Sequence, residues 1–207
     1  MKNISYTILT VLFLIQTSSV KSQDRMVFKE YGIQYISSFS FHNGIQTIEI
    51  PGRSLPNNLS IFSLHQVVGY LFNPHFSLGM GLGFEKWRRT SFIPIYADIR
   101  LNMLRGRYSP TMMLNVGYSS KWYESPRPDP TERVINGATE GLFFEGGVGV
   151  KVMFQEAKSV FFTVTYKMQE SDIKYSDDEN SGMSHLTTNQ SKKVQYQFIG
   201  ARVGLIF

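Results

Sequence analysis

The sequence predicts an all-β protein, namely an eight-stranded antiparallel up-and-down transmembrane β-barrel. In Phe76–Glu85, large apolar residues at even positions alternate with small or charged residues at odd positions, which gives a strand one apolar and one polar face. This period of two recurs along most of the chain, behind an N-terminal export signal, and the chain ends in Gly-Leu-Ile-Phe. Strands of about 9–11 residues are long enough to cross a bilayer.

The N-terminus has the three parts of a secretory signal. Lys2 supplies a positive start, Ile8–Ile15 forms an apolar core, and Val20 and Ser22 occupy the small-residue positions before a cleavage site. The apolar run is shorter than the roughly 20 residues of a spanning helix. We therefore expect a signal peptide over residues 1–22 and an outer-membrane barrel domain over residues 23–207, integral to the bacterial outer membrane.

Composition removes several classes of function. The chain has no cysteine, which excludes disulfides and thiolate metal sites. Its formal charge of +5 includes Lys2 and Lys21 of the predicted signal, and the small excess that remains gives no reason to expect nucleic-acid binding. The four histidines are far apart in the sequence, without the spacing of metal ligands, so we expect no metal and no cofactor.

The first four predicted strands alternate in the same way. Phe28–Phe41 places aromatic residues and Ile on one face and Gly, Gln and Ser on the other. Leu59–Phe72 does so with one exception, Gln66, on its apolar face. Phe76–Trp87 and Phe92–Met103 complete this half, each with an apolar face expected to meet lipid.

The last four predicted strands complete an even number. Ser109–Trp122 and Gly141–Phe154 alternate Met, Leu, Val and Phe with Asn, Ser, Gly and charged residues. Val160–Gln169 alternates apolar residues with Thr, Lys and Gln, and Lys193–Phe207 alternates them with Gly and Arg. Glycine weakens an ordinary strand, but a small inward residue leaves room for a larger neighbour across a narrow lumen.

The connections between the strands predict the topology. Those after the second, fourth and sixth strands are short, whereas His42–Asn58, Tyr123–Glu140 and Glu170–Lys192 are long and polar. In outer-membrane barrels the short turns are periplasmic and the long loops are outside. With an even number of strands, both ends of the barrel domain are then expected in the periplasm.

The inward face collects charges of both signs. Eight strands enclose only enough space for side chains, and unpaired charges there would be costly, so we expect a paired network that plugs the barrel rather than a charged aqueous pore. Arg202 and Glu30 are predicted to pair, because the first and last strands must meet to close the barrel. The predicted network comprises Glu30, Glu85, Asp98, Arg100, Glu145, Lys151, Lys167 and Arg202.

Aromatic residues near the strand ends are typical of the girdles at the two membrane interfaces. Ser63 and His65 lie two apart on one strand face, as a nucleophile and base would, but no third group that orients the base is evident. The residues predicted to form the girdles are Trp87, Trp122, Tyr123, Phe72, Phe76, Phe154 and Phe207.

Several segments carry a resemblance to a known family. Val67–Pro74, Phe76–Gly83, Ile93–Arg100 and the closing Ile199–Phe207 resemble small outer-membrane proteins of Bacteroidota type, the "outer membrane protein beta-barrel domain" family. The resemblance covers nearly the whole mature chain and implies an OmpA/OmpX-like eight-stranded barrel. It supplies no catalytic motif, because the family is defined by its architecture. The final Phe207 also resembles the terminal signal read by the barrel-insertion machinery.

These observations predict a non-enzymatic outer-membrane barrel with a plugged polar lumen. Its role is expected to be structural or adhesive, or that of a subunit in an envelope assembly. The expected partners are outer-membrane lipid, lipopolysaccharide and the insertion machinery. The alternatives are a narrow passive channel, a lipid-modifying enzyme and a soluble lipocalin-like barrel; the small inward glycines oppose the last, since a ligand cup needs large apolar walls.

Overall fold

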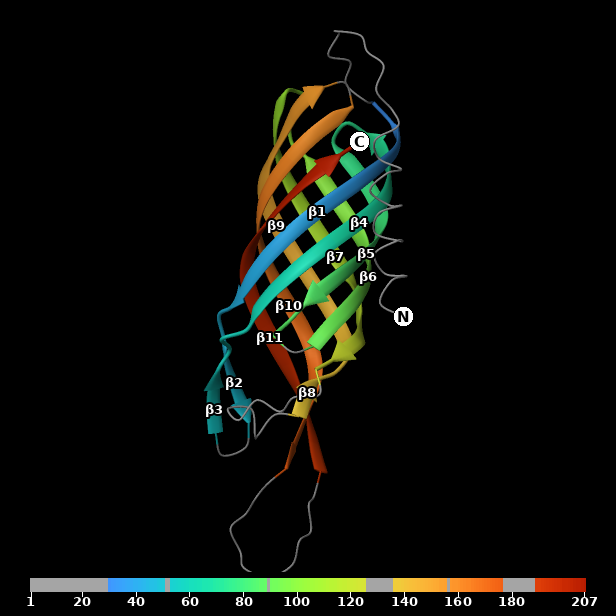
Figure 1. Ribbon diagram of the computed structural model, residues 1–207. Helices are drawn as coiled ribbons and strands as arrows, with labels where there is room; N and C mark the ends of the chain where they lie inside the picture. Colours follow the sequence, from blue (N-terminus) through green and yellow to red (C-terminus); the bar gives the residue numbers. More distant parts are fainter. Residues whose placement is uncertain (1–29, 51–52, 89, 126–135, 156, 177–188) are drawn as a thin grey trace, which may run out of the picture.

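A computed structural model of the chain describes residues 30–50, 53–88, 90–125, 136–155, 157–176 and 189–207 (Figure 1). The predicted signal peptide and its cleavage site lie outside the described residues. No helix in the described part of the chain is long and apolar enough to cross a bilayer.

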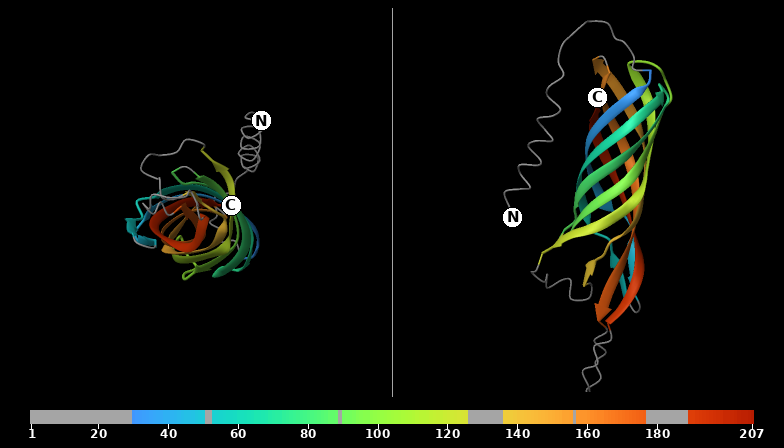
Figure 2. Two further views of the ribbon diagram at one scale, coloured as in Figure 1. Left: turned by 90° about the horizontal axis from the view of Figure 1, so that it is seen from below. Right: turned by 90° about the vertical axis from the view of Figure 1, so that its right-hand side faces the viewer.

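Eight antiparallel strands form a closed barrel, as the sequence predicts. Each barrel strand pairs with its neighbour along the chain, and the last pairs with the first from Ile36↔Ile206 to Gly44↔Phe198, which closes the ring seen end-on in Figure 2. The backbones of Tyr35 and Phe207 also bond to each other in both directions. The barrel strands are β1 (Gly32–Gly44), β4 (Ser60–Asn73), β5 (Phe76–Lys86), β6 (Thr90–Asn102), β7 (Tyr108–Glu124), β9 (Gly141–Gln155), β10 (Lys158–Ser176) and β11 (Asn189–Ile206).

The outer surface of the barrel is apolar, because on each barrel strand the apolar set of alternate residues points outward. Met80 on β5 is 72% exposed, and Val68 beside it on β4 is 55% exposed. Gln66 is exposed among these apolar side chains, as predicted. A continuous apolar exterior with polar residues inside is the reverse of a soluble barrel and is typical of barrels that face lipid.

The two ends of the barrel differ. At the turn end, short connections join β4 to β5, β6 to β7 and β9 to β10, and the described chain begins and ends here. At the opposite end, the loop end, β10 and β11 continue as a paired hairpin as far as Ser176↔Asn189, well beyond the other strands (Figure 1).

The loop end contains more structure than the sequence predicted. The predicted loop His42–Asn58 includes a small hairpin formed by β2 (Thr47–Ile50) and β3 (Arg53–Pro56). The predicted strand Val160–Gln169 extends to Ser176, and β8 (Asn136–Ala138) pairs with that extension. These segments are either too short or too polar to show the long run of alternating apolar residues that marks the barrel strands.

Glycine makes space for the largest inward aromatic side chain at mid-barrel. A Cβ atom on Gly81 would lie 2.3 Å from the ring of Tyr96, and one on Gly117 would lie 2.5 Å from the Tyr96 Cβ. Both distances are too short for real atoms, so Tyr96 reaches the centre of the lumen only because its neighbours on both adjacent strands have no side chain.

Candidate functional site

The lumen contains most of the buried polar and charged side chains of the described residues. Its polar and charged side chains come from the inward positions of the eight barrel strands and are almost fully withdrawn from solvent. Buried charges are stable only when they are paired and hydrogen-bonded. The geometry of the pairs therefore decides what the lumen can do.

The centre of the lumen is organised by Arg202 of β11. Its guanidinium donates a 2.7 Å hydrogen bond to the Glu145 carboxylate of β9 and a 2.9 Å hydrogen bond to Nε2 of His65 on β4. A guanidinium has only donors, so His65 must accept through Nε2 and carry its proton on Nδ1. That Nδ1 lies 3.0 Å from the hydroxyl of Tyr96 and donates to it. Arg202 thus fixes both the carboxylate and the tautomer of the histidine.

His42 of β1 joins the same cluster from the other side. Its Nε2 lies 2.8 Å from Oγ1 of Thr165 and 3.5 Å from Oε1 of Glu145. Glu145 therefore lies between the Arg202 guanidinium, to which it is hydrogen-bonded, and the His42 imidazole, and the cluster brings together side chains from β1, β4, β9, β10 and β11.

Toward the turn end, the network continues through Asn115 of β7. With its amide nitrogen facing Asp98, Asn115 donates to that carboxylate at 2.9 Å and accepts from Arg202 at 2.9 Å. Asp98 in turn accepts two hydrogen bonds from Arg100, at 2.9 and 3.2 Å. The Arg100 guanidinium also lies over the Phe161 ring, 4.4 Å from its centroid, a favourable cation–π arrangement.

A second buried ion pair lies nearer the loop end. Lys167 of β10 pairs with Glu85 of β5, which comes from the other side of the barrel, and both side chains are buried. The Lys167 ammonium lies 4.9 Å from the centroid of the Phe143 ring, and Trp87 Nε1 donates to the second Glu85 oxygen at 3.3 Å. Both oxygens of Glu85 therefore have partners.

An apolar cluster fills the lumen beyond this pair, and sequence reasoning missed it. Trp87 is 2% exposed and packs at ring-centroid distances of 5.0 to 5.4 Å against Phe92, Tyr196 and Phe198. The prediction that Trp87 belongs to the outer girdle is therefore wrong. The alternation in the sequence does indicate the correct position. Odd-numbered residues of this strand, including Gly83 and Glu85, point inward, and Trp87 is also odd-numbered. We call this group the aromatic plug; its members are Ile61, Trp87, Phe92, Val194, Tyr196 and Phe198.

Glu30 is the second correction. Its side chain is 58% exposed and pairs with Arg105, which is 53% exposed, at the turn end of the barrel. The predicted Arg202–Glu30 pair is wrong, because Glu30 precedes the start of β1 at Gly32 and does not reach the lumen. Arg202 pairs with Glu145 instead.

Apart from Lys151, the other predicted network residues all lie in the buried ion pairs described above. These six residues are Glu85, Asp98, Arg100, Glu145, Lys167 and Arg202. Lys151 lies apart from them, half-buried at the turn end. Of the other predicted girdle residues, Trp122 and Tyr123 are exposed near the loop end, and Phe72 and Phe154 are exposed near the turn end. Phe76 and Phe207 are partly buried at the turn end.

The Ser63–His65 pair does not have the geometry of a nucleophile and its base. Ser63 is buried without a hydrogen-bond partner for its hydroxyl. Nε2 of His65, the acceptor nitrogen, is occupied by Arg202, and its Nδ1 is taken by Tyr96. Within the described residues, no group of three or more His, Asp or Glu side chains is placed to hold a metal ion.

Solved structures of bacterial outer-membrane barrels have the same fold. The outer membrane protein OprG from Pseudomonas aeruginosa matches 86% of this chain and 97% of its own, with a TM-score of 0.56 and 13% sequence identity. Neisserial surface protein A (NspA) matches 84% of this chain and 97% of its own, with a TM-score of 0.50 and 12% identity. No protein-family model and no curated protein sequence matches the chain. At such low identity the likeness establishes the eight-stranded barrel fold alone.

Proposed function

We propose that this protein is an integral, non-enzymatic barrel of the bacterial outer membrane, exported by a cleaved signal peptide. We further propose that its lumen is closed and that its role is structural or adhesive, or that of a subunit in an envelope assembly. The proposal rests on two features that occur together. The outward faces of the strands are apolar, and the lumen is filled by the Arg202–Glu145 and Lys167–Glu85 ion pairs and by the aromatic plug. The resemblance of the sequence segments supports membership of the small Bacteroidota-type, OmpA/OmpX-like barrels.

In this proposal the turn end faces the periplasm and the loop end faces the outside. The exposed apolar band contacts outer-membrane lipid, and the exposed Lys86 near the loop end is placed to meet lipopolysaccharide phosphates, whereas Lys121 at the same end is paired with Glu124. Phe207 at the turn end would be read by the barrel-insertion machinery. The projecting β10–β11 hairpin is then the largest described element outside the membrane, and we assign partner contacts to it.

The two alternative functions have less support. A passive channel needs a continuous aqueous path, whereas buried ion pairs and aromatic rings occupy the middle and the loop end of this lumen. A lipid-modifying enzyme needs a base with a free nitrogen beside its nucleophile, and Arg202 occupies that nitrogen of His65.

Replacing Leu82 with Arg tests the membrane location. Leu82 is 54% exposed on the outer face of β5, and Arg on the lipid face at the bilayer midplane costs roughly 2–4 kcal/mol but only about 0–1 kcal/mol near an interface. We expect Leu82→Arg to lower the unfolding free energy in lipid vesicles by that larger amount. Tyr123→Arg near the loop end is the matched control and should cost about 1 kcal/mol or less. Equal tolerance of both changes would contradict the lipid-facing assignment.

Shortening the projecting hairpin tests the proposed role. Ser171 and Val194 are paired in register, so a variant that joins Ser171 directly to Val194 through an Asn-Gly turn should keep the barrel and the aromatic plug and lose the projection. We expect the shortened protein to insert and to show normal heat-modifiable migration, while envelope proteins cross-linked to the full chain in intact cells are lost. If the shortened and full chains capture the same partners, the hairpin is not the contact surface.

A further inference from the structure

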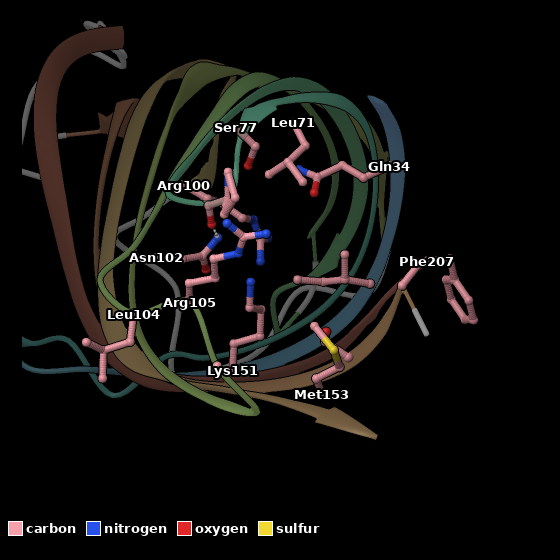
Figure 3. A pocket seen from close by; sticks show the side chains of 15 residues that line it. Gln34, Leu71, Ser77, Arg100, Asn102, Leu104, Arg105, Lys151, Met153 and Phe207 are labelled. Carbon is pink, nitrogen blue, oxygen red and sulfur yellow. Dashed lines mark hydrogen bonds between the residues drawn. The ribbon is translucent and has the colours of Figure 1, made fainter. Parts of the chain in front are cut away.

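A pocket at the turn end contains a positive charge for which the network provides no partner. It opens between β1, β4, β5, β6, β9, β10 and β11, and Figure 3 shows the nitrogen atoms of Arg100 and Lys151 directed toward its centre. The polar residues that line it include Gln34, Ser77, Arg100, Asn102, Lys151 and Ser159.

The two cations of the pocket differ in how they are held. Arg100 is fixed by Asp98 and by the Phe161 ring, and its guanidinium still has N–H groups beyond the two that contact Asp98. Lys151 is half-buried, and no carboxylate of the described residues, the C-terminal one included, lies within 4.0 Å of its ammonium. Arg105, which also lines the pocket, is neutralised by Glu30.

An unpaired cation that is partly withdrawn from water is costly unless an anion accompanies it. Every other charged lumenal side chain named above has its opposite charge within the protein, so the excess at Lys151 is local. Beside it, a planar guanidinium with free donors offers directed hydrogen bonds to an oxyanion. The hydroxyls of Ser77 and Ser159, on buried residues lining the same pocket, are further available donors.

We propose that this pocket binds a small oxyanion, a phosphate or a carboxylate, between Lys151 and Arg100. The Lys151 ammonium supplies the uncompensated charge, and Arg100, held rigid by Asp98, supplies oriented donors. The narrowness of an eight-stranded barrel restricts the ligand to a small anion or to the end group of a longer molecule. The binding rests on this geometry alone, whereas access from the periplasm rests on the proposed topology.

The test is calorimetric titration of the full barrel, folded in an uncharged detergent without phosphate, with inorganic phosphate, with acetate, and with chloride at matched ionic strength. We expect saturable binding of phosphate, acetate or both, with no comparable binding of chloride. Lys151→Met should weaken the affinity by about ten- to a hundredfold, the usual value of a charge-assisted hydrogen bond. Lys151→Arg should retain most of the affinity.

Lys158→Met is the matched control, because Lys158 begins β10 at the same end of the barrel but does not line the pocket. It removes the same charge and should leave the affinity unchanged. Absence of saturable binding of either oxyanion to the unmodified barrel would overturn the proposal, whether or not the Lys151 variants fold. Equal weakening by Lys158→Met and Lys151→Met would also overturn it, since the effect would then be one of general charge. Failure here leaves the Leu82→Arg test of membrane location unaffected.

Discussion

Replacing Arg202 with Met is expected to lower the free energy of unfolding by about 3–5 kcal/mol, because a buried carboxylate loses its partner. Arg202 is fully buried and its guanidinium contacts Glu145, His65 and Asn115. Met fills similar space without charge, so the loss reports the broken network rather than a cavity. The measurement is urea unfolding in detergent or lipid, followed by gel migration and tryptophan fluorescence.

The double change Arg202→Met with Glu145→Gln separates pairing from general damage. Because the two side chains contact each other at 2.7 Å, the double variant should cost less than the sum of the single changes. Glu30→Gln is the control, since the exposed Glu30 does not reach the lumen; its effect should stay within about 0.5 kcal/mol. Strict additivity of the Arg202 and Glu145 changes would contradict the pairing.

Trp87→Ala is expected to have the second large effect. Trp87 is buried in the aromatic plug and bonds to Glu85, and truncating such a residue costs about 3–5 kcal/mol. Trp122, which is 68% exposed on the outside of β7, provides the matched control, and its change to Ala should cost at least about 2 kcal/mol less. Similar losses for both would mean that Trp87 belongs to the exterior, as the sequence first indicated.

The barrel strands were predictable because their chemistry repeats every two residues. Apolar residues at alternate positions identify the lipid-facing side of each strand, and the structure confirms those faces on all eight barrel strands. The same parity assigned Glu85, Glu145, Lys167 and Arg202 to the interior. The same parity places Trp87 inside as well, against the general expectation that an aromatic residue at a strand end lies in the outer girdle.

The partners inside the lumen were not predictable in the same way. Strand order identifies neighbours, but Lys167 on β10 reaches Glu85 on β5, across the barrel. Arg202 on β11 reaches past β10 to Glu145 on β9. Such contacts depend on the tilt and stagger of the strands, which set the height of each side chain along the axis. Alternation in the sequence indicates which face a residue occupies but not this height.

The loop end escaped prediction for a different reason. The β2–β3 hairpin and the extension of β10 beyond Gln169 are held by backbone pairing outside the barrel. The strands of that hairpin have only four residues each, and the extension of β10 is mostly polar, so neither contains the long run of alternating apolar residues that identifies the barrel strands.

The closure of the lumen is the central claim, and conductance through the unmodified protein tests it most directly. The protein would be inserted into a planar lipid bilayer, and current recorded as further barrels insert. The filled lumen predicts that insertion, verified by heat-modifiable migration of protein recovered from matching vesicles, adds no stable conducting level. Long-lived ohmic steps that increase in number with each inserted barrel would contradict it, because ions cannot pass a cross-section occupied by Arg202, Lys167 and the aromatic plug.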